Sequence, residues 1–207
     1  MINELIKRYP ALAECKNDIQ SATDALIGCY ENGGKLLLCG NGGSCSDCEH
    51  IAGELMKGFM NKRVLSDEQK MMMKNKCGAL SHDTLCKLQN ALPAISLTSF
   101  TALNTAFCND VDANLVYAQS VLALGKPGDV LLAISTSGSS KNVIEAAKVA
   151  KATGLKVIAL TGKSGGKLKE LADVSITVPE CETYKVQELH LPVYHYICAK
   201  IEDHFFG

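Results

Sequence analysis

Residues 130–141 read VLLAISTSGSSK, an apolar run followed by a turn rich in hydroxyl groups. The apolar part, residues 130–134, is short and uninterrupted, which is typical of a strand buried on both faces of a sheet. The Ser, Thr and Gly residues at 135–140 break this pattern, and a helical pattern begins at Lys141. An order of strand, turn and helix is the repeating unit of a parallel α/β fold.

The same unit recurs along the chain. Apolar runs bounded by Gly, Ser, Asp or Pro occur at residues 35–39, 94–97 and 156–160, with a weaker one at 174–178. Helical stretches such as residues 141–152 lie between most of them. We therefore expect an α/β protein with a parallel sheet covered by helices on both faces.

Two long helical segments are expected at the ends of the chain. The first covers residues 3–30 and is interrupted near its start by Pro10, and the second covers residues 182–206. Pro192 lies inside the second segment and should bend or loosen one turn, because proline lacks the N–H of a helical hydrogen bond. Long terminal helices suit either subunit packing or coverage of the sheet.

Residues 60–90 depart from the alternation of strands and helices. The segment is rich in Lys, Met, Asn and Gln and separates a helix from the second strand. A lid over a ligand and a helical insertion packed on the surface are both compatible with it, and the surface insertion is the simpler interpretation. We expect a single domain, residues 1–207, with an insertion at about 60–90.

Composition excludes several classes of protein. The 207 residues carry 21 Lys+Arg against 22 Asp+Glu, a net charge of −1, which disfavours a nucleic-acid partner. No apolar run is long enough to span a membrane, and the N-terminus lacks the pattern of a signal peptide. The ten cysteines fall inside predicted helices and strands, which indicates reduced thiols and a cytoplasmic location.

The turn at residues 135–140 predicts a phosphate site. Ligands of parallel sheets bind at the carboxyl ends of the strands, and hydroxyls with free backbone N–H groups can surround a phosphate there. A simple helix cap would need one Ser or Thr, whereas this turn has five hydroxyl residues. The lack of a basic side chain in the turn favours a sugar phosphate over a triphosphate.

The turn after the first strand, residues 40–44, reads GNGGS and also suits an anion. It is not a dinucleotide fingerprint, because Cys45 replaces the third glycine and no acidic residue ends the second strand. Residues 162–164 resemble the end of a P-loop, but Val157 occupies the position of the upstream glycine. No nucleotide cofactor is therefore expected.

Four side chains on two helices form a candidate site. His50 and Glu54 are four residues apart, so they share one helix face and suit a divalent metal or a substrate proton. An ordinary contact on a solvated face has the same spacing. Gln187 and His195 lie on nearly one stripe of the last helix and would add an amide and an imidazole to the same ligand set.

These motifs together resemble the sugar isomerase (SIS) domain family, and within it the phosphoheptose isomerases. The resemblance is carried by residues 40–44 with His50 and Glu54, and by residues 135–140, 159–166 and 187–195. It covers nearly the whole chain except residues 60–90. It implies a three-layer αβα sandwich with a five-stranded parallel sheet, and a homotetramer whose sites lie between subunits.

The resemblance also implies roles for individual residues. Phosphate would be held by Ser44, Ser135, Thr136, Ser137 and Ser140, and further substrate contacts would come from Asn41, Gly42, Gly43, Asn109, Asp110 and Gln187. Zinc would be bound by His50, Glu54, Gln187 and His195, with Glu54 and His195 as the catalytic acid/base pair. The chain departs from the family at residues 57–59, where an Arg is common, and at Tyr184, which replaces an Asp.

We therefore expect an aldose–ketose isomerase acting on a phosphorylated sugar; the resemblance specifies sedoheptulose 7-phosphate and D-glycero-D-manno-heptose 7-phosphate. Glu54 would remove the proton next to the carbonyl to form an enediol, and His195 would move protons between oxygens. Zinc would polarise those oxygens. The alternative is a non-catalytic sugar-phosphate sensor or adaptor, which would need the phosphate turn but not His50, Glu54 and His195 together.

Overall fold

A computed structural model describes the whole chain, Met1–Gly207. At its centre is a five-stranded sheet in which every pairing is parallel and the strand order is β2-β1-β3-β4-β5. The strands are β1 (Leu36–Cys39), β2 (Ala94–Ser96), β3 (Val130–Ser135), β4 (Lys156–Thr161) and β5 (Val174–Thr177). Each of the five predicted apolar runs is a strand, so the predicted α/β fold is confirmed.

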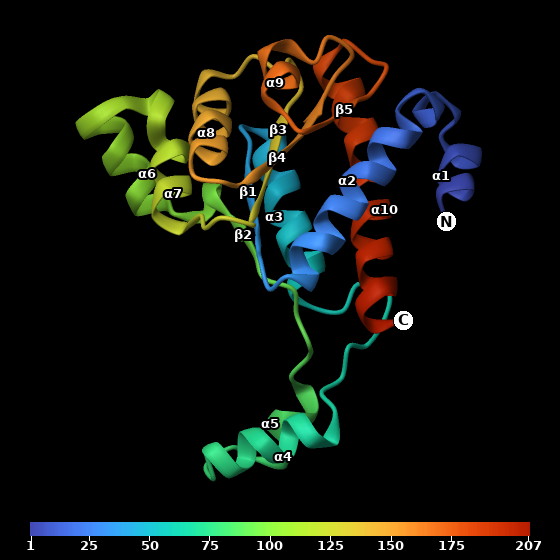
Figure 1. The fold of residues 1–207 in the computed structure, drawn as a ribbon, viewed down its shortest axis with the longest axis vertical. Helices are drawn as coiled ribbons and strands as arrows, with labels where there is room; N and C mark the ends of the chain where they lie inside the picture. The colour runs from blue at the N-terminus through green and yellow to red at the C-terminus, as the bar shows by residue number, and fades with distance from the viewer.

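Helices cover both faces of this sheet (Figure 1). The α-helices are α1 (Ile2–Arg8), α2 (Lys16–Glu31), α3 (Gly43–Met56), α4 (Asp67–Lys76), α5 (His82–Lys87), α6 (Thr101–Phe107), α7 (Val116–Leu124), α8 (Lys141–Ala152), α9 (Gly166–Leu171) and α10 (Thr183–Phe206). Short 3₁₀ segments are η1 (Pro10–Cys15), η2 (Leu97–Ser99) and η4 (Ala113–Leu115), and η3 (Cys108–Asp112) is a π-helical turn.

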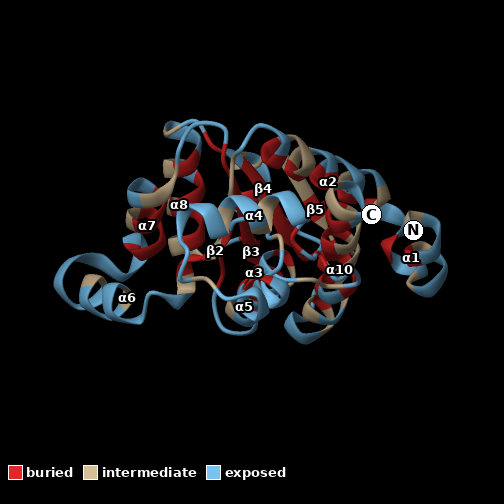
Figure 2. Cartoon of the chain, turned by 90° about the horizontal axis from the view of Figure 1, so that it is seen from below, coloured by how far each residue is buried: buried red, intermediate tan, exposed pale blue.

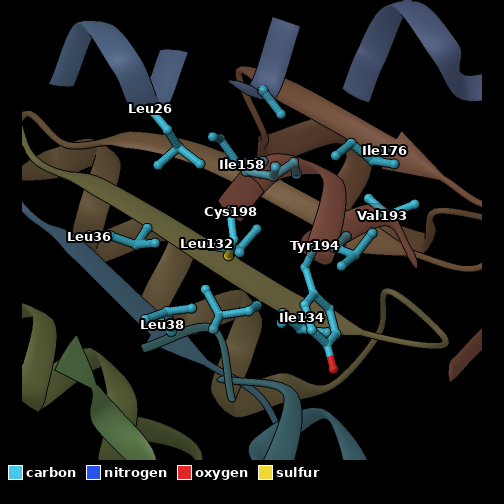
Figure 3. Packing of buried hydrophobic residues seen from close by; sticks show 14 of the residues in the cluster. Leu26, Leu36, Leu38, Leu132, Ile134, Ile158, Ile176, Val193, Tyr194 and Cys198 are labelled. Carbon is cyan, nitrogen blue, oxygen red and sulfur yellow. The ribbon is translucent and has the colours of Figure 1, made fainter. Parts of the chain in front are cut away.

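Two hydrophobic cores flank the sheet and make the structure three-layered. Alternate residues of a strand point to opposite faces, so Leu132 packs with α2, α3 and α10, whereas Leu131 packs with α7, α8 and α9. Figure 3 shows the first core, in which Leu132 and Ile158 from the sheet meet Val193 and Cys198 from α10. The uninterrupted apolar pattern of β3 follows from this burial on both faces.

The two predicted terminal helical segments are present, with differences at Pro10 and Pro192. The break near Pro10 is a complete 3₁₀ segment, η1, between α1 and α2. Helix α10 begins at Thr183 and continues through Pro192 to Phe206 without interruption. The apolar residues on its inner face, including Val193, Ile197 and Ile201, are fully or almost fully buried and hold it against the sheet.

Residues 64–89, which we call the arm, project away from the sheet (Figure 1). The expectation of an insertion packed on the surface is therefore wrong. Helix α4 has no buried residue, and Figure 2 shows that it is exposed along most of its length, unlike the helices that flank the sheet. Leu65 and Leu85 are the buried side chains of the arm, too few to anchor it to the body of the molecule.

No helix in the structure combines the length and the apolar character that a membrane-crossing segment needs.

Candidate active site

Helices α3 and α10 run side by side in the same direction and meet at three levels. At the first level, Gly43 opens α3 directly against the amide of Gln187, so any Cβ at residue 43 would collide with that amide. At the second level, His50 contacts Tyr194 and His195. At the third, the backbone just after α3 is bound by Glu202.

The second level brings together three of the predicted catalytic and metal-binding residues. The Nε2 atom of His50 lies 3.2 Å from Oε1 of Glu54, as expected for residues four apart on a helix. The ring of His195 stands nearly perpendicular to the ring of His50, with 5.0 Å between the ring centres. A carboxylate and two imidazoles from two helices thus face one another within a single chain.

His195 is held in a state suited to accepting a proton. Its Nε2 atom is buried and has no hydrogen-bond partner in the chain. Burial lowers the pKa of His195, the neighbouring His50 lowers it further, and Glu54 only partly opposes these effects. The imidazole is therefore neutral at pH 7, with a ring nitrogen available to a proton or another electrophile.

Tyr194 and Asp47 also lie at this cluster, and neither was among the residues predicted for the site. The Tyr194 hydroxyl lies 3.0 Å from Nδ1 of His50. Burial raises the pKa of Asp47, and the Tyr194 hydroxyl and His50 partly oppose that rise. Asp47 lies three residues before His50, a spacing that puts both on one helix face. Figure 3 shows the Tyr194 hydroxyl pointing out of the hydrophobic cluster.

Lys57 lies beside Glu54, directly after the end of α3. Its Nζ atom is 3.3 Å from Oε2 of Glu54, so Glu54 has His50 on one oxygen and Lys57 on the other. The Lys57 side chain is mostly exposed, whereas Glu54 is mostly buried. The carboxylate is therefore fixed in place with positive charge on its solvent side.

The serine loop, residues 135–140, lies between β3 and α8. Ser135 is buried, and its hydroxyl is 3.0 Å from the hydroxyl of Ser140. The N–H groups of Thr136, Ser137 and Ser140 donate to no protein atom, and no side chain caps the start of α8. The hydroxyls are therefore not used as a helix cap, and the free N–H groups are available to an anion.

The turn between β4 and α9 supports this loop. Gly138 has a φ of 63°, and a Cβ there would collide with the carbonyl of Gly165. The N–H of Leu168 donates to the carbonyl of Gly138 at 3.0 Å. Glycine is required at residue 138 both for its left-handed backbone and for this close approach.

A pair of amides joins the first turn to the start of α8. Asn41 and Asn142 exchange two hydrogen bonds of 2.9 Å, and the Tyr117 hydroxyl donates to the carbonyl of Gly40 at 2.8 Å. Asn142 is the second residue after the serine loop, a position that could have drawn attention to it. These bonds hold the Gly-rich turn, where Ser44 is buried, beside the serine loop.

Three predicted site residues, Asn109, Asp110 and Gln187, lie apart from the His50–Glu54–His195 cluster within one chain. Asn109 and Asp110 are exposed on η3 and hydrogen-bond each other at 2.8 Å, without a bond to another predicted site residue. Gln187 lies about two helical turns along α10 from His195. One cavity, about 540 Å³, lies between η4, α8 and α9, and no predicted site residue lines it. His195 lines a smaller one, about 280 Å³, between α1 and α10.

The donor set at the second level suits the chemistry of zinc. Two ligands of a tetrahedral zinc ion lie about 3.3 Å apart when each bond is about 2.0–2.1 Å, close to the 3.2 Å between His50 Nε2 and Glu54 Oε1. The unpartnered Nε2 of His195 is a third donor. No group of three or more His, Cys, Asp or Glu side chains, however, converges as a metal-binding cluster in the single chain.

Comparison with known proteins shows which family the chain belongs to. The model of the SIS domain family matches residues 2–90 and 85–162. A phosphoheptose isomerase from Helicobacter pylori (strain P12) is 38% identical, over 99% of this chain and 98% of that protein. One from Burkholderia pseudomallei (strain 1710b) is 38% identical, over 91% of this chain and 83% of that protein.

Solved structures agree. The phosphoheptose isomerase of Neisseria gonorrhoeae has a TM-score of 0.76 and 35% identity, covering 97% of this chain and 94% of its own. That of Francisella tularensis has a TM-score of 0.78 and 33% identity, covering 95% and 91%. The chain therefore belongs to the SIS domain family and, within it, to the phosphoheptose isomerases.

Proposed function

We propose that the protein is an aldose–ketose isomerase that interconverts sedoheptulose 7-phosphate and D-glycero-D-manno-heptose 7-phosphate. The observation that carries the proposal is the grouping of Glu54, His50 and His195 in one chain that also holds a phosphate loop built from free N–H groups and hydroxyls. A sensor would need the loop alone. The relatives that match over nearly the whole chain are phosphoheptose isomerases.

The serine loop and the Gly-rich turn bind the phosphate and thereby orient the sugar. The N–H groups of Thr136, Ser137 and Ser140 donate to phosphate oxygens, and the hydroxyls of Ser44 and Ser135 add further contacts. Binding energy at the phosphate then fixes the carbonyl end of the sugar at the helix pair, so the chemical step becomes effectively intramolecular.

Proton transfer takes place at the helix pair. Glu54 removes the proton from the carbon next to the carbonyl and leaves an enediolate; after a proton has moved between the two oxygens, Glu54 returns its proton to the neighbouring carbon. Neutral His195 takes a proton from one oxygen and delivers it to the other, so the two carbons exchange the roles of carbonyl and alcohol. Lys57 and His50 hold the Glu54 carboxylate in position.

Zinc is proposed as the cofactor, held by His50, Glu54 and His195, with Gln187 as the further ligand proposed from the sequence. When bound, it would stabilise negative charge on the carbonyl and enediol oxygens. The support is the set of donors at the second level, above all the short His50–Glu54 separation and the unpartnered nitrogen of His195. Turnover measured with and without a chelator tests this assignment.

We also propose a homotetramer in the cytoplasm. Support for assembly comes from the apolar side chains that the chain leaves exposed on the arm, including Met71 and Met72, and support for the location from ten free cysteines. Native mass spectrometry should give four copies of the 22.1 kDa chain. Cell fractionation tests the location.

The isomerase proposal is tested with Glu54→Gln. This variant should lose about 10²–10⁴-fold in turnover, because an amide cannot accept the substrate proton, while calorimetry should show that sedoheptulose 7-phosphate still binds. Glu49→Gln is the matched control, since Glu49 lies on the same helix and its carboxylate accepts hydrogen bonds from Thr98 and Ser99. It should keep full activity.

Two results would contradict the proposal. Full activity in Glu54→Gln would remove Glu54 from the chemistry. A wild-type protein that binds five- to seven-carbon sugar phosphates but incorporates no deuterium from heavy water next to the carbonyl would be a sensor, because isomerisation through an enediol exchanges that hydrogen with solvent.

A further inference from the structure

The last turn of α3 carries Glu54, and its backbone is held by a residue outside the helix. In a continuing helix the carbonyl of Glu54 would accept a hydrogen bond from the N–H of Gly58, four residues later. That N–H instead donates to Oε1 of the Gln89 side chain at 2.6 Å. Arg63 takes its place, since its Nη2 atom donates to the Glu54 carbonyl at 2.9 Å. The backbone at the proposed base is therefore bound by a side chain nine residues further along the chain.

Arg63 is itself fixed on several sides. Its side chain is closed to solvent, and its Nε atom donates to Oε1 of Glu202 on α10 at 2.7 Å. Its Nη1 atom donates to the carbonyl of Leu55 at 2.6 Å, and the guanidinium lies over the ring of Phe206, with 4.8 Å to the ring centre. A guanidinium offers its N–H donors in one rigid plane, so these bonds fix the directions of the two carbonyls. Arg63 therefore fastens the end of α3 to α10.

The same ion pair also reaches the surroundings of His195. Glu202 follows His195 by seven residues, about two helical turns, so both lie on one face of α10. Oε1 of Glu202 accepts a hydrogen bond from the N–H of Phe59 at 2.8 Å. The ring of Phe59 packs against the ring of His195, with 5.6 Å between ring centres. The ion pair thus fixes the backbone at Glu54 on one side and a ring that packs on His195 on the other.

We propose that Arg63 is a positioning residue for the isomerase reaction, which sets the place of the Glu54 carboxylate relative to His195. Because its side chain is closed to solvent, it acts through Glu54 and not on the substrate. Displacing a reacting group by about 1 Å can cost about 10²-fold in rate. The inference rests on the proposed function for the reaction in which Glu54 takes part. A purely structural residue, by contrast, would change the amount of folded protein but not the turnover of each folded molecule.

The first experiment measures the kinetics of Arg63→Lys. Lysine keeps a positive charge beside Glu202 but offers one ammonium group in place of the planar fork of donors. Urea denaturation first shows that the variant is folded under the conditions of the assay. The kcat for sedoheptulose 7-phosphate should then fall about 10–100-fold. KM should stay close to the wild-type value, because the serine loop is untouched and the loss is confined to the chemical step.

The matched control is Asp129→Asn, which weakens a second, mostly buried ion pair. Asp129 pairs with Lys35, and the two residues directly precede β3 and β1. This pair therefore lies at the amino ends of the strands, whereas the serine loop follows the carboxyl end of β3. Asp129→Asn should lower the stability of the protein to urea and keep the wild-type kcat.

The second experiment follows the same contact without turnover, by amide hydrogen exchange. In Arg63→Lys the amide hydrogens of residues 54–56 should exchange faster with heavy water, because the last turn of α3 has lost the bonds that close it. Those of residues 47–50, one to two turns earlier in α3, should exchange as in the wild type. Asp129→Asn should show no selective change at residues 54–56.

A folded Arg63→Lys protein with the wild-type kcat would overturn the proposal, and so would an equal loss of kcat in Asp129→Asn. If Arg63→Lys does not fold, Glu202→Gln decides the question: it keeps the shape of the partner, removes the charge that orients the guanidinium, and should lower kcat in the same way. A wild-type protein without isomerase activity would refute the proposed function, while hydrogen exchange at residues 54–56 would still show whether Arg63 holds the turn.

Discussion

The α3–α10 helix pair and the arm differ sharply in how the chain supports them. The pair is joined at three levels by a tight glycine contact, a cluster of rings and a buried ion pair. The arm has good local order, with a complete capping box at Ser66, but α4 buries no residue. The side chains of the candidate site are thus fixed by contacts within the chain, whereas the arm is stabilised mainly by its own local helix signals.

The two regions meet at the buried pair of Arg63 and Glu202. Glu202 accepts hydrogen bonds from Arg63 at 2.7 Å and from the three N–H groups of residues 59–61 at 2.6–3.0 Å. Arg63 also donates to the carbonyls of Leu55 and Glu54 at 2.6 and 2.9 Å. This pair therefore closes the end of α3, directly beside Glu54, and fixes the base of the arm.

The largest expected effect follows from breaking that pair. Glu202→Ala should lower the free energy of unfolding by about 3–5 kcal/mol, because it leaves the Arg63 charge buried and uncompensated. Urea denaturation measures the loss. The matched control is Glu31→Ala. It removes the exposed partner of His204, which lies on α10 as Glu202 does, and it should cost about 1 kcal/mol or less. Equal losses in both variants would show that the two regions are not joined by this pair.

A smaller effect is expected on the pH dependence of stability, where buried His190 of the helix pair should differ from exposed His82 of the arm. Burial lowers the pKa of His190 on α10 to about 4, and neither of its ring nitrogens has a partner. The pKa of a histidine in the unfolded chain is about 6.5. Below that pH the unfolded chain binds a proton at His190, whereas the folded chain stays unprotonated there until about pH 4. The contribution to stability is therefore present in full above pH 6.5 and is lost as the pH falls toward 4. The loss should reach about 2–3 kcal/mol by pH 4.5.

This pH dependence is measured by urea denaturation at pH 7 and pH 4.5. His190→Leu should show a smaller loss between the two pH values than the wild type. His82 on the arm is exposed, so His82→Gln should leave the loss unchanged. A His190→Leu protein with the full wild-type loss would assign the acid sensitivity to other groups.

The smallest effect is expected on the arm itself. Met71 and Met72 are 62% and 52% exposed, so replacing both with Ser should change the unfolding free energy of the isolated chain by no more than about 0.5 kcal/mol. Sedimentation should nevertheless show weaker assembly if the arm contacts another copy. A large loss of stability with unchanged assembly would mean that the arm is packed on its own chain.

The sequence predicted most of the fold because the parallel sheet is buried on both faces. Burial of this kind requires uninterrupted apolar runs, and those runs are visible without a structure, as at residues 130–134. The arm was misjudged because its prediction rested on composition, and the capping box at Ser66 that the structure shows reports local order as well. Neither carries information on whether a helix has a surface to pack against.

The candidate site likewise divides into residues that local sequence spacing predicts and residues that depend on packing between distant helices. His50 and Glu54 were predictable, because a spacing of four on one helix fixes their neighbourhood. Tyr194 could not be found, since its contact with His50 depends on how α10 is placed beside α3, and its neighbour His195 gives no sign of it. Asn142 likewise acts through a contact with Asn41, 101 residues away, that only the folded chain reveals.

The geometry at the base of the arm has an evolutionary consequence. The chain leaves and re-enters the body at Val64 and Gln89, which pair directly in a short bridge. Because the two ends already meet, segments of many lengths can be inserted or removed there at little entropic cost and without disturbing the α3–α10 helix pair. Descendants of a common ancestor could therefore change the length of this extension without rebuilding the sheet or the helix pair beside it.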